Sequence, residues 1–259
     1  RFARPKLPVM VVLIMRYLAR EFSETRAMPC QKRAHFLGEV FRLDAKAEGD
    51  TVAVGGWRSA DGGRAADAAW FSVSLTRKSA PWAFARGEPF RAIAALELLA
   101  SLLGLMLLVP EGDAAGDSSA VLTLSCGTDN QGNSFLLDRM LTTKYPLGIV
   151  LMELAHQMRR RRLILRAKWL PRLQNEEADA LTNLDFRHFD PRNRVHVNLE
   201  DMKFGVLNQL FDYGESYISD LEAARTKAKE SKAADLVRDP LTKKRLKAAG
   251  DTLRERDPW

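Results

Sequence analysis

The chain has 259 residues, 46% of them apolar, which is enough for one large domain or for one medium domain with extensions. Its net charge of +7 favours a polyanionic partner, either nucleic acid or an acidic membrane surface. The two cysteines, Cys30 and Cys126, exclude a disulfide framework and a cysteine zinc site. We therefore expect reduced thiols in an intracellular protein of the nucleus or cytoplasm.

Residues 1–38 are predicted to form a helical arm and a linker. The apolar run 9–15 is far shorter than the roughly 20 residues that cross a bilayer, and we expect no membrane partner. No convincing small-residue cleavage site follows the run, which argues against a signal peptide. The pattern predicts a helix that packs on the main domain or on a domain upstream of Arg1.

Three strands are predicted next, over residues 40–45, 51–57 and 68–76, with short turns between them that favour an antiparallel meander. Asp44 lies in the first of these strands, where an unpaired carboxylate is costly to bury. Lys46, two residues further on, is one candidate partner, and a functional site is the other explanation.

Residues 88–109 predict a helix that is apolar on nearly all sides and therefore mostly buried. Glu97 is the only ionisable group between Arg91 and the end of this run, so it needs a cation, a metal or a proton. The preceding loop, 80–89, carries Arg86 and either touches a substrate or is an ordinary surface loop.

The stretch 121–133 predicts a strand that ends in a turn before a helix. Asp129 lies in that turn, where a rigidly held carboxylate suits a metal ion, although it would also suit a simple helix cap. A helix over 146–163 ends in four arginines, 159–162, which offer phosphate contacts or form a solvated basic face. We expect a structural role for His156 on that helix.

A last strand, 164–171, and a short helix, 174–183, complete the predicted domain. Asn175 and Asp179 are four residues apart and so share one face of this helix. The chain beyond residue 190 predicts further helices and, after Arg225, an exposed or disordered mixed-charge segment.

Four short strings, each on the expected element and in the family's order along the chain, resemble the type 1 ribonuclease H family. The string 128–131 (TDNQ) is similar to its T-D-S-Q, and 96–100 (LELLA) resembles its E-L-x-A helix. Trp169 followed by 175–179 (NEEAD) resembles its W…N-E-x-x-D ending, and the ALTN that follows is similar to the ending in tyrosine-recombinase retroelements. The family's histidine-bearing loop before the last helix is missing here.

The resemblance implies an α/β, ribonuclease H-like fold over residues 39–185, with a mixed five-stranded sheet flanked by helices. Residues 1–38 and 186–259 would then be helical extensions, the latter partly disordered. The implied activity is endonucleolytic hydrolysis of the RNA strand of RNA–DNA hybrids, in a piece of a retroelement polyprotein with an upstream reverse transcriptase domain as a partner.

The implied chemistry uses two Mg²⁺ ions roughly 4 Å apart, with Mn²⁺ able to substitute. Asp44, Glu97 and Asp129 would form the core of the site, and Asp179 would complete the second metal position. Without metal, such carboxylates would repel by roughly 4 kcal/mol per pair at 4 Å and an effective dielectric near 20. Hybrid contacts to phosphates and 2′-hydroxyls are expected from Arg86, Asn130, Gln131, Asn133, Arg172 and Asn175.

The sequence leaves two alternatives open. One is a related nuclease that cuts DNA, against which the short N-E-x-x-D ending is mild evidence. The other is an inactive module that only binds nucleic acid or supports a polymerase, and the presence of all four carboxylates argues against it.

Overall fold

The structure is a computed structural model that describes residues 9–23, 33–84, 87–111, 120–142 and 144–208, with isolated positions between 219 and 230. The chain divides into a unit Leu13–Gly214, which holds the sheet, and a second unit made of Arg1–Val12 and Glu215–Trp259. Most of the second unit, including most of the predicted C-terminal helices, lies outside the described residues.

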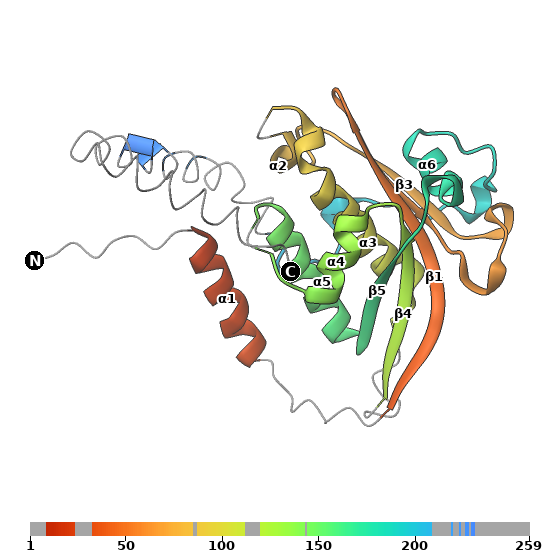
Figure 1. The fold of residues 1–259 in the computed structure, drawn as a ribbon, viewed down its shortest axis with the longest axis horizontal. Helices are drawn as coiled ribbons and strands as arrows, with labels where there is room; N and C mark the ends of the chain where they lie inside the picture. Colours follow the sequence, from red (N-terminus) through yellow and green to blue (C-terminus); the bar gives the residue numbers. More distant parts are fainter. Residues whose placement is uncertain are drawn as a thin grey trace, which may run out of the picture. The chain divides into compact units, whose positions relative to one another are not determined.

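The central element is a five-stranded sheet with the order β3-β2-β1-β4-β5 (Figure 1). The strands β1, β2 and β3 are antiparallel neighbours, whereas β4 and β5 run parallel to β1. This mixed sheet confirms the predicted architecture and makes the strands that lead to Asp44 and Asp129 direct neighbours. The strands are β1 (Arg33–Glu48), β2 (Thr51–Trp57), β3 (Trp70–Leu75), β4 (Ala120–Thr128) and β5 (Leu163–Trp169).

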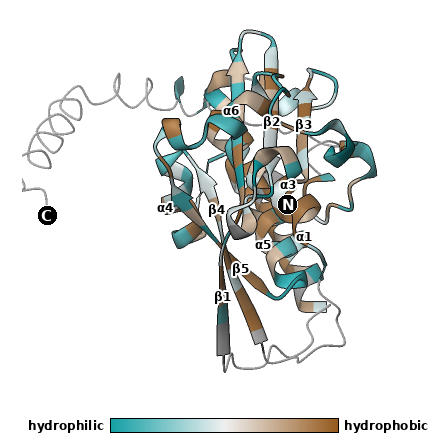
Figure 2. Cartoon of the chain, turned by 90° about the vertical axis from the view of Figure 1, so that its right-hand side faces the viewer, coloured by the Kyte–Doolittle hydropathy of each residue, from teal (hydrophilic) through white to brown (hydrophobic). Residues whose placement is uncertain are grey.

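Helices cover both faces of the sheet: α3, α4 and α5 lie on one side and α6 on the other (Figure 1). The helices are α1 (Val9–Ser23), α2 (Pro81–Phe84), α3 (Ile93–Leu108), α4 (Gln131–Arg139), α5 (Leu147–Arg160) and α6 (Glu176–Thr182). Short 3-10 helices lie in the connections, at Ala60–Gly62, Ala65–Asp67, Pro89–Ala92, Arg172–Gln174, Pro191–Asn193 and Leu199–Asp201. Hydrophilic residues gather in the connections between these elements (Figure 2).

Two glycines allow the helices to approach the sheet closely, one on each face. A Cβ atom at Gly104 of α3 would lie 2.7 Å from the Phe41 ring on β1. A Cβ atom at Gly55 of β2 would lie 2.8 Å from the Leu181 side chain on α6. Both distances are shorter than a real carbon contact permits, so a larger residue would push α3 or α6 away from the strands that they contact.

The helix α3 is buried nearly all round, as its apolar pattern predicts. Within the described residues, one helical stretch, Pro89–Leu108, is long and apolar enough to cross a membrane by length and composition alone, with a mean hydropathy of 1.9. The structure buries 72% of that stretch inside the fold, which is the environment of a core helix.

Two predicted segments differ in detail from the structure. The strand β1 begins at Arg33, before the predicted end of the N-terminal arm at residue 38. Its pairing with β4 shifts register on both sides of Glu39. Such bulges break the alternation that marks a strand. The loop 80–89 is not an ordinary surface loop, because α2 buries Trp82 and Phe84.

Candidate metal centre

Asp44 lies towards the C-terminal end of β1, opposite Gly55 of β2, with only 6% of its surface exposed. Its carboxylate oxygen Oδ2 accepts a hydrogen bond of 2.6 Å from the Thr182 hydroxyl at the end of α6. Lys46, the partner considered from the sequence, instead pairs with Glu48 at 3.1 Å and donates to Asn183 Oδ1 at 2.8 Å. The charge of Asp44 therefore has no cationic partner within the described part of the chain.

Glu97 reaches the same place from α3 and is 4% exposed. The Thr128 hydroxyl, at the end of β4, lies 3.4 Å from Glu97 Oε2 and is a weak donor to it. Among the described residues no ion pair involves Glu97. The buried carboxylate therefore still needs a cation, a metal or a proton, as its sequence context predicts.

Asp129 follows β4 directly and is partly exposed. It is not the cap of the next helix: Asn130 is the N-cap of α4, and its side-chain oxygen accepts from the Asn133 amide at 3.1 Å. The Trp169 indole donates to the backbone oxygen of Asp129 at 3.1 Å, which ties the end of β4 to the end of β5. The Asp129 carboxylate faces the other two carboxylates.

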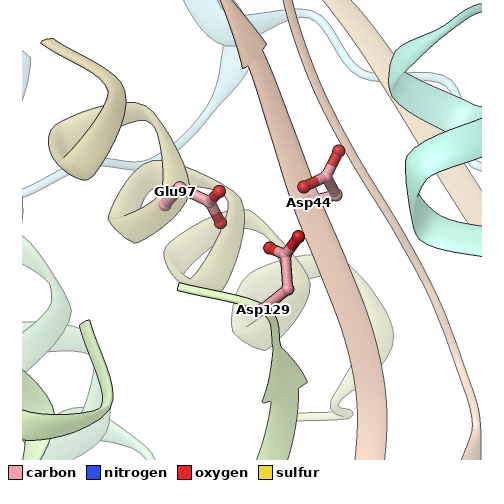
Figure 3. Close-up of side chains that lie close together, drawn as sticks. All are labelled: Asp44, Glu97 and Asp129. Atoms are coloured by element: carbon pink, nitrogen blue, oxygen red, sulfur yellow. The ribbon is translucent and has the colours of Figure 1, made fainter. Parts of the chain in front are cut away.

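The three carboxylates converge from β1, α3 and the end of β4 (Figure 3). Each contributes one oxygen, and these oxygens lie within 4.8 Å of one another. They open into a cavity of about 410 Å³. The lining residues are Asp44, Ala45, Lys46, Ala47, Glu48, Glu97, Asp129, Arg172, Asp179 and Asn183.

Burial and mutual repulsion raise the pKa values of two of these groups. The pKa of Asp44 rises to about 6, mainly because of burial, with further contributions from the charges of Asp129 and Asp179 and an opposing one from the Thr182 hydrogen bond. The pKa of Glu97 rises well above its ordinary value because of burial and the charges of Asp44 and Asp129. The site therefore favours protons or a bound cation over three free negative charges.

The donor set fits a hard divalent cation. Three carboxylates supply only oxygen ligands, which Mg²⁺, Mn²⁺ and Ca²⁺ prefer, and the triad has no thiolate or imidazole of the kind that zinc and copper sites use. The cavity leaves room for the waters that Mg²⁺ keeps in protein sites.

Asp179, the fourth predicted carboxylate, lines the same cavity from α6 and is not one of the three converging groups. Its Oδ1 accepts from Arg172 Nη2 at 2.8 Å, and its Oδ2 accepts from Asn183 Nδ2 at 2.7 Å. The structure thus brings three of the four predicted ligands together and holds the fourth at the rim by hydrogen bonds.

The residues predicted to contact nucleic acid fall into different environments. Arg172 and Gln131 are exposed, and Arg172 lies at the cavity. Asn133 and Asn175 are 2% and 1% exposed, and their amides donate to the backbone oxygens of Ala94 and Leu43. These two asparagines hold α3 and β1 in place instead of facing a ligand. The remaining two differ: Asn130 caps α4, and Arg86 lies outside the described residues.

The four arginines at 159–162 are not a phosphate surface beside the site. Arg162 O accepts from Leu122 N near the start of β4, roughly 20 Å of strand away from Asp129. The Arg161 side chain is 4% exposed and pairs with Glu111 at 2.9 Å. His156 on the same helix is buried, in agreement with the structural role expected for it.

Three polar residues around the carboxylates carry weak sequence signals. Thr182 and Asn183 lie three and four residues after Asp179, so helix geometry places them on its face. Thr128 precedes Asp129 in the chain. The hydrogen bonds of Thr182 to Asp44 and of Thr128 to Glu97 depend on how α6 and α3 pack on the sheet, which spacing alone does not give.

A comparison with solved structures found a likeness to the crystal structure of ribonuclease H1 from the halophilic archaeon Halobacterium salinarum NRC-1. The match has 18% sequence identity and a TM-score of 0.39, and it covers 58% of this chain and 97% of that chain. No model of a protein family and no curated protein matches the sequence. The ribonuclease H-like fold is instead evident in the strand order and directions of the sheet.

Proposed function

We propose that this protein is a nuclease that depends on divalent metal ions and hydrolyses the RNA strand of RNA–DNA hybrids. The observation that carries the proposal is the convergence of three carboxylate oxygens within 4.8 Å, two of them on nearly buried side chains. Bringing such groups together without cations costs free energy, so a purely structural origin for the cluster is a poor explanation.

Asp44, Glu97 and Asp129 would hold Mg²⁺, for which Mn²⁺ can substitute, and Asp179 would contribute to a second ion at the rim. In phosphodiester hydrolysis such ions lower the pKa of a bound water and stabilise the leaving oxygen. Thr182 orients the Asp44 carboxylate through its hydroxyl. The Trp169 indole fixes the backbone at Asp129, which keeps that ligand beside the other two.

A nucleic-acid substrate agrees with the net charge of +7 and with the exposed Arg172 at the cavity. The preference for a hybrid, the retroelement origin and an upstream reverse transcriptase domain rest on the sequence strings around Asp129 and Asp179. Recognition of a hybrid would proceed through phosphates and 2′-hydroxyls at the rim, since these report the A-like shape of the duplex.

The test compares cleavage of a labelled RNA–DNA hybrid, duplex DNA and single-stranded RNA, with and without Mg²⁺. We expect the wild-type protein to cut the RNA of the hybrid only when Mg²⁺ is present, and Asp129→Asn to abolish cleavage while the circular dichroism spectrum is unchanged. Asp138→Asn is the control, because Asp138 is an exposed carboxylate on α4 that does not line the cavity. Wild-type cleavage by Asp129→Asn would end the proposal.

The same experiment separates the two alternatives. Cleavage of duplex DNA in place of the hybrid would identify a related DNA nuclease with the same metal centre. Metal-independent binding of the hybrid without cleavage of any substrate would identify a binding module.

A further inference from the structure

Asp179 is held at the cavity rim by an arginine. Arg172 Nη2 donates to Asp179 Oδ1 at 2.8 Å, while Asn183 Nδ2 donates to the other oxygen, Oδ2, at 2.7 Å. The amide oxygen of Asn183 in turn accepts from Lys46 Nζ at 2.8 Å. Each carboxylate oxygen of Asp179 therefore already accepts a hydrogen bond, and an ion that binds Oδ1 meets the positive charge of the Arg172 guanidinium there.

The guanidinium of Arg172 lies within the field of three carboxylates of the site, those of Asp179, Asp129 and Asp44. The pKa of Arg172 is raised, first by its hydrogen bond and charge interaction with Asp179, and further by the charges of Asp129 and Asp44. Arg172 also lines the cavity into which the three converging carboxylates open. Its side chain is 78% exposed, so it can leave Asp179 without disturbing the packed core.

Building on the proposed metal centre, we propose that Arg172 is a latch that competes with the second divalent ion for Asp179. The first ion meets no such competitor, because no arginine or lysine of the described chain pairs with Asp44, Glu97 or Asp129. The second ion binds more weakly, because the positive charge of the guanidinium at Asp179 Oδ1 repels it until Arg172 moves away.

A substrate phosphate in the cavity would draw Arg172 away from Asp179. Guanidinium groups bind phosphate oxygens through two parallel hydrogen bonds, which compensates Arg172 for the loss of Asp179. Substrate phosphate and the second ion are then expected to favour each other, because each binds better once Arg172 has moved.

The experiment is a calorimetric titration of the full chain with Mn²⁺ alone. For the wild type we expect one tighter and one weaker class of sites. In Arg172→Gln the weaker class should bind about fivefold more tightly, since an exposed ion pair contributes only modestly to the equilibrium. The tighter class should change much less. Equal or weaker affinity at the second class in Arg172→Gln would overturn the latch.

Two further variants control the result. Arg187→Gln removes the same charge from a comparable exposed pair, in which Arg187 Nε donates to Asp185 Oδ1 at 2.9 Å away from the cavity lining. It should titrate as the wild type does. In an Asp179→Asn background the weaker class of sites should disappear. Adding Arg172→Gln to this variant should then change the affinity for the remaining Mn²⁺ ion very little.

The titration gives different results if only the competition by Arg172 is wrong and if the metal centre itself is wrong. If one Mn²⁺ ion binds the wild type and Arg172→Gln equally, with no second class in either variant, the latch is wrong and the metal centre stands. If the wild type binds no Mn²⁺, the metal centre and the latch are both wrong. Thermal unfolding of each variant confirms that the titrated protein is folded.

Discussion

Two buried glutamates on neighbouring helices show how this fold treats a carboxylate in opposite ways. Glu153 on α5 is fully buried and Glu97 on α3 is 4% exposed. The Glu153 carboxylate accepts hydrogen bonds from the backbone amides of Gly205 and Leu207, each at 2.9 Å, from that of Val206, and from the Gln157 side chain at 2.7 Å. These donors satisfy the charge and tie the segment at 205–207 to α5.

Within the described residues Glu97 has fewer donors, the Thr128 hydroxyl and the Ala45 backbone N–H. Its side-chain hydrogen bond from Thr128 is long, at 3.4 Å, and its nearest charged neighbours are the carboxylates of Asp44 and Asp129. A carboxylate that stabilises a fold is surrounded by N–H groups, whereas one that serves a cation is surrounded by further acceptors. Glu153 therefore has the surroundings of a carboxylate that stabilises the fold, and Glu97 has those of a candidate metal ligand.

The same substitution at the two sites should have opposite effects on stability, and the larger effect is expected at Glu153. Glu153→Gln removes the charge that strengthens the hydrogen bonds from the backbone N–H groups at 205–207, and it puts an amide donor where Oε1 accepts from the Gln157 side chain. We expect the free energy of unfolding to fall by about 3 kcal/mol, because buried hydrogen bonds to a charged group are lost. Urea denaturation measures the change, and an unaltered midpoint would contradict the structural role.

Glu97→Gln should instead raise the stability of the metal-free protein. The amide keeps the shape of the side chain and removes one charge from a cluster that already raises the pKa of Asp44. We expect a gain of about 1–2 kcal/mol at pH 7, which lies between the repulsion of one charge pair at about 4 Å in water and at an effective dielectric near 20. The same variant should lose the increase in melting temperature that Mg²⁺ produces in the wild type. A destabilised Glu97→Gln would mean that Glu97 is a structural acid like Glu153.

Acidification should stabilise the metal-free protein through Asp44. Its pKa is 3.8 ordinarily and about 6 in the folded chain, so between these values the folded state keeps a proton that the unfolded state has lost. Stability from this group therefore rises as the pH falls from 7 to 5, by about 1 kcal/mol. Asp44→Asn should lack this component of the pH profile. Saturating Mg²⁺ should reverse the slope, because an ion binds the deprotonated carboxylate.

The contrast also shows what the sequence could and could not predict. Glu97 was identifiable because it interrupts an apolar helix, and Asp44 because it interrupts an apolar strand. Glu153 gave no comparable signal, since it lies in an amphipathic helix and its donors come from residues 52 to 54 positions later in the chain. Spacing reveals an unpaired charge, but a distant partner is visible only once the chain is folded.

The order of the elements followed from hydrophobic periodicity, and β2 was predicted with its correct ends, Thr51–Trp57. The start of β1 was hidden by the bulge at Glu39, which interrupts the two-residue period. The family resemblance implies that Asn133 and Asn175 contact nucleic acid. Their side chains turn inward, since buried backbone oxygens of α3 and β1 require donors.

The smallest expected effect concerns the one hydroxyl that supports Asp44. The Thr182 hydroxyl donates to Asp44 Oδ2 at 2.6 Å and opposes the rise in the pKa of that carboxylate. Thr182→Val keeps the branched shape and removes the donor, so the pKa of Asp44 should rise further. The loss of one hydrogen bond to a charged group should lower the stability at pH 7 by about 1 kcal/mol.

Thr182→Ser, which retains the hydroxyl, is the matched control and should stay close to the wild type. The loss in Thr182→Val should shrink at pH 4, where the folded protein holds Asp44 protonated and the hydrogen bond is no longer assisted by charge. Urea denaturation of the three proteins at both pH values measures this difference. An equal loss at the two pH values would mean that Thr182 stabilises α6 independently of Asp44, and that the carboxylate is held in place by the sheet alone.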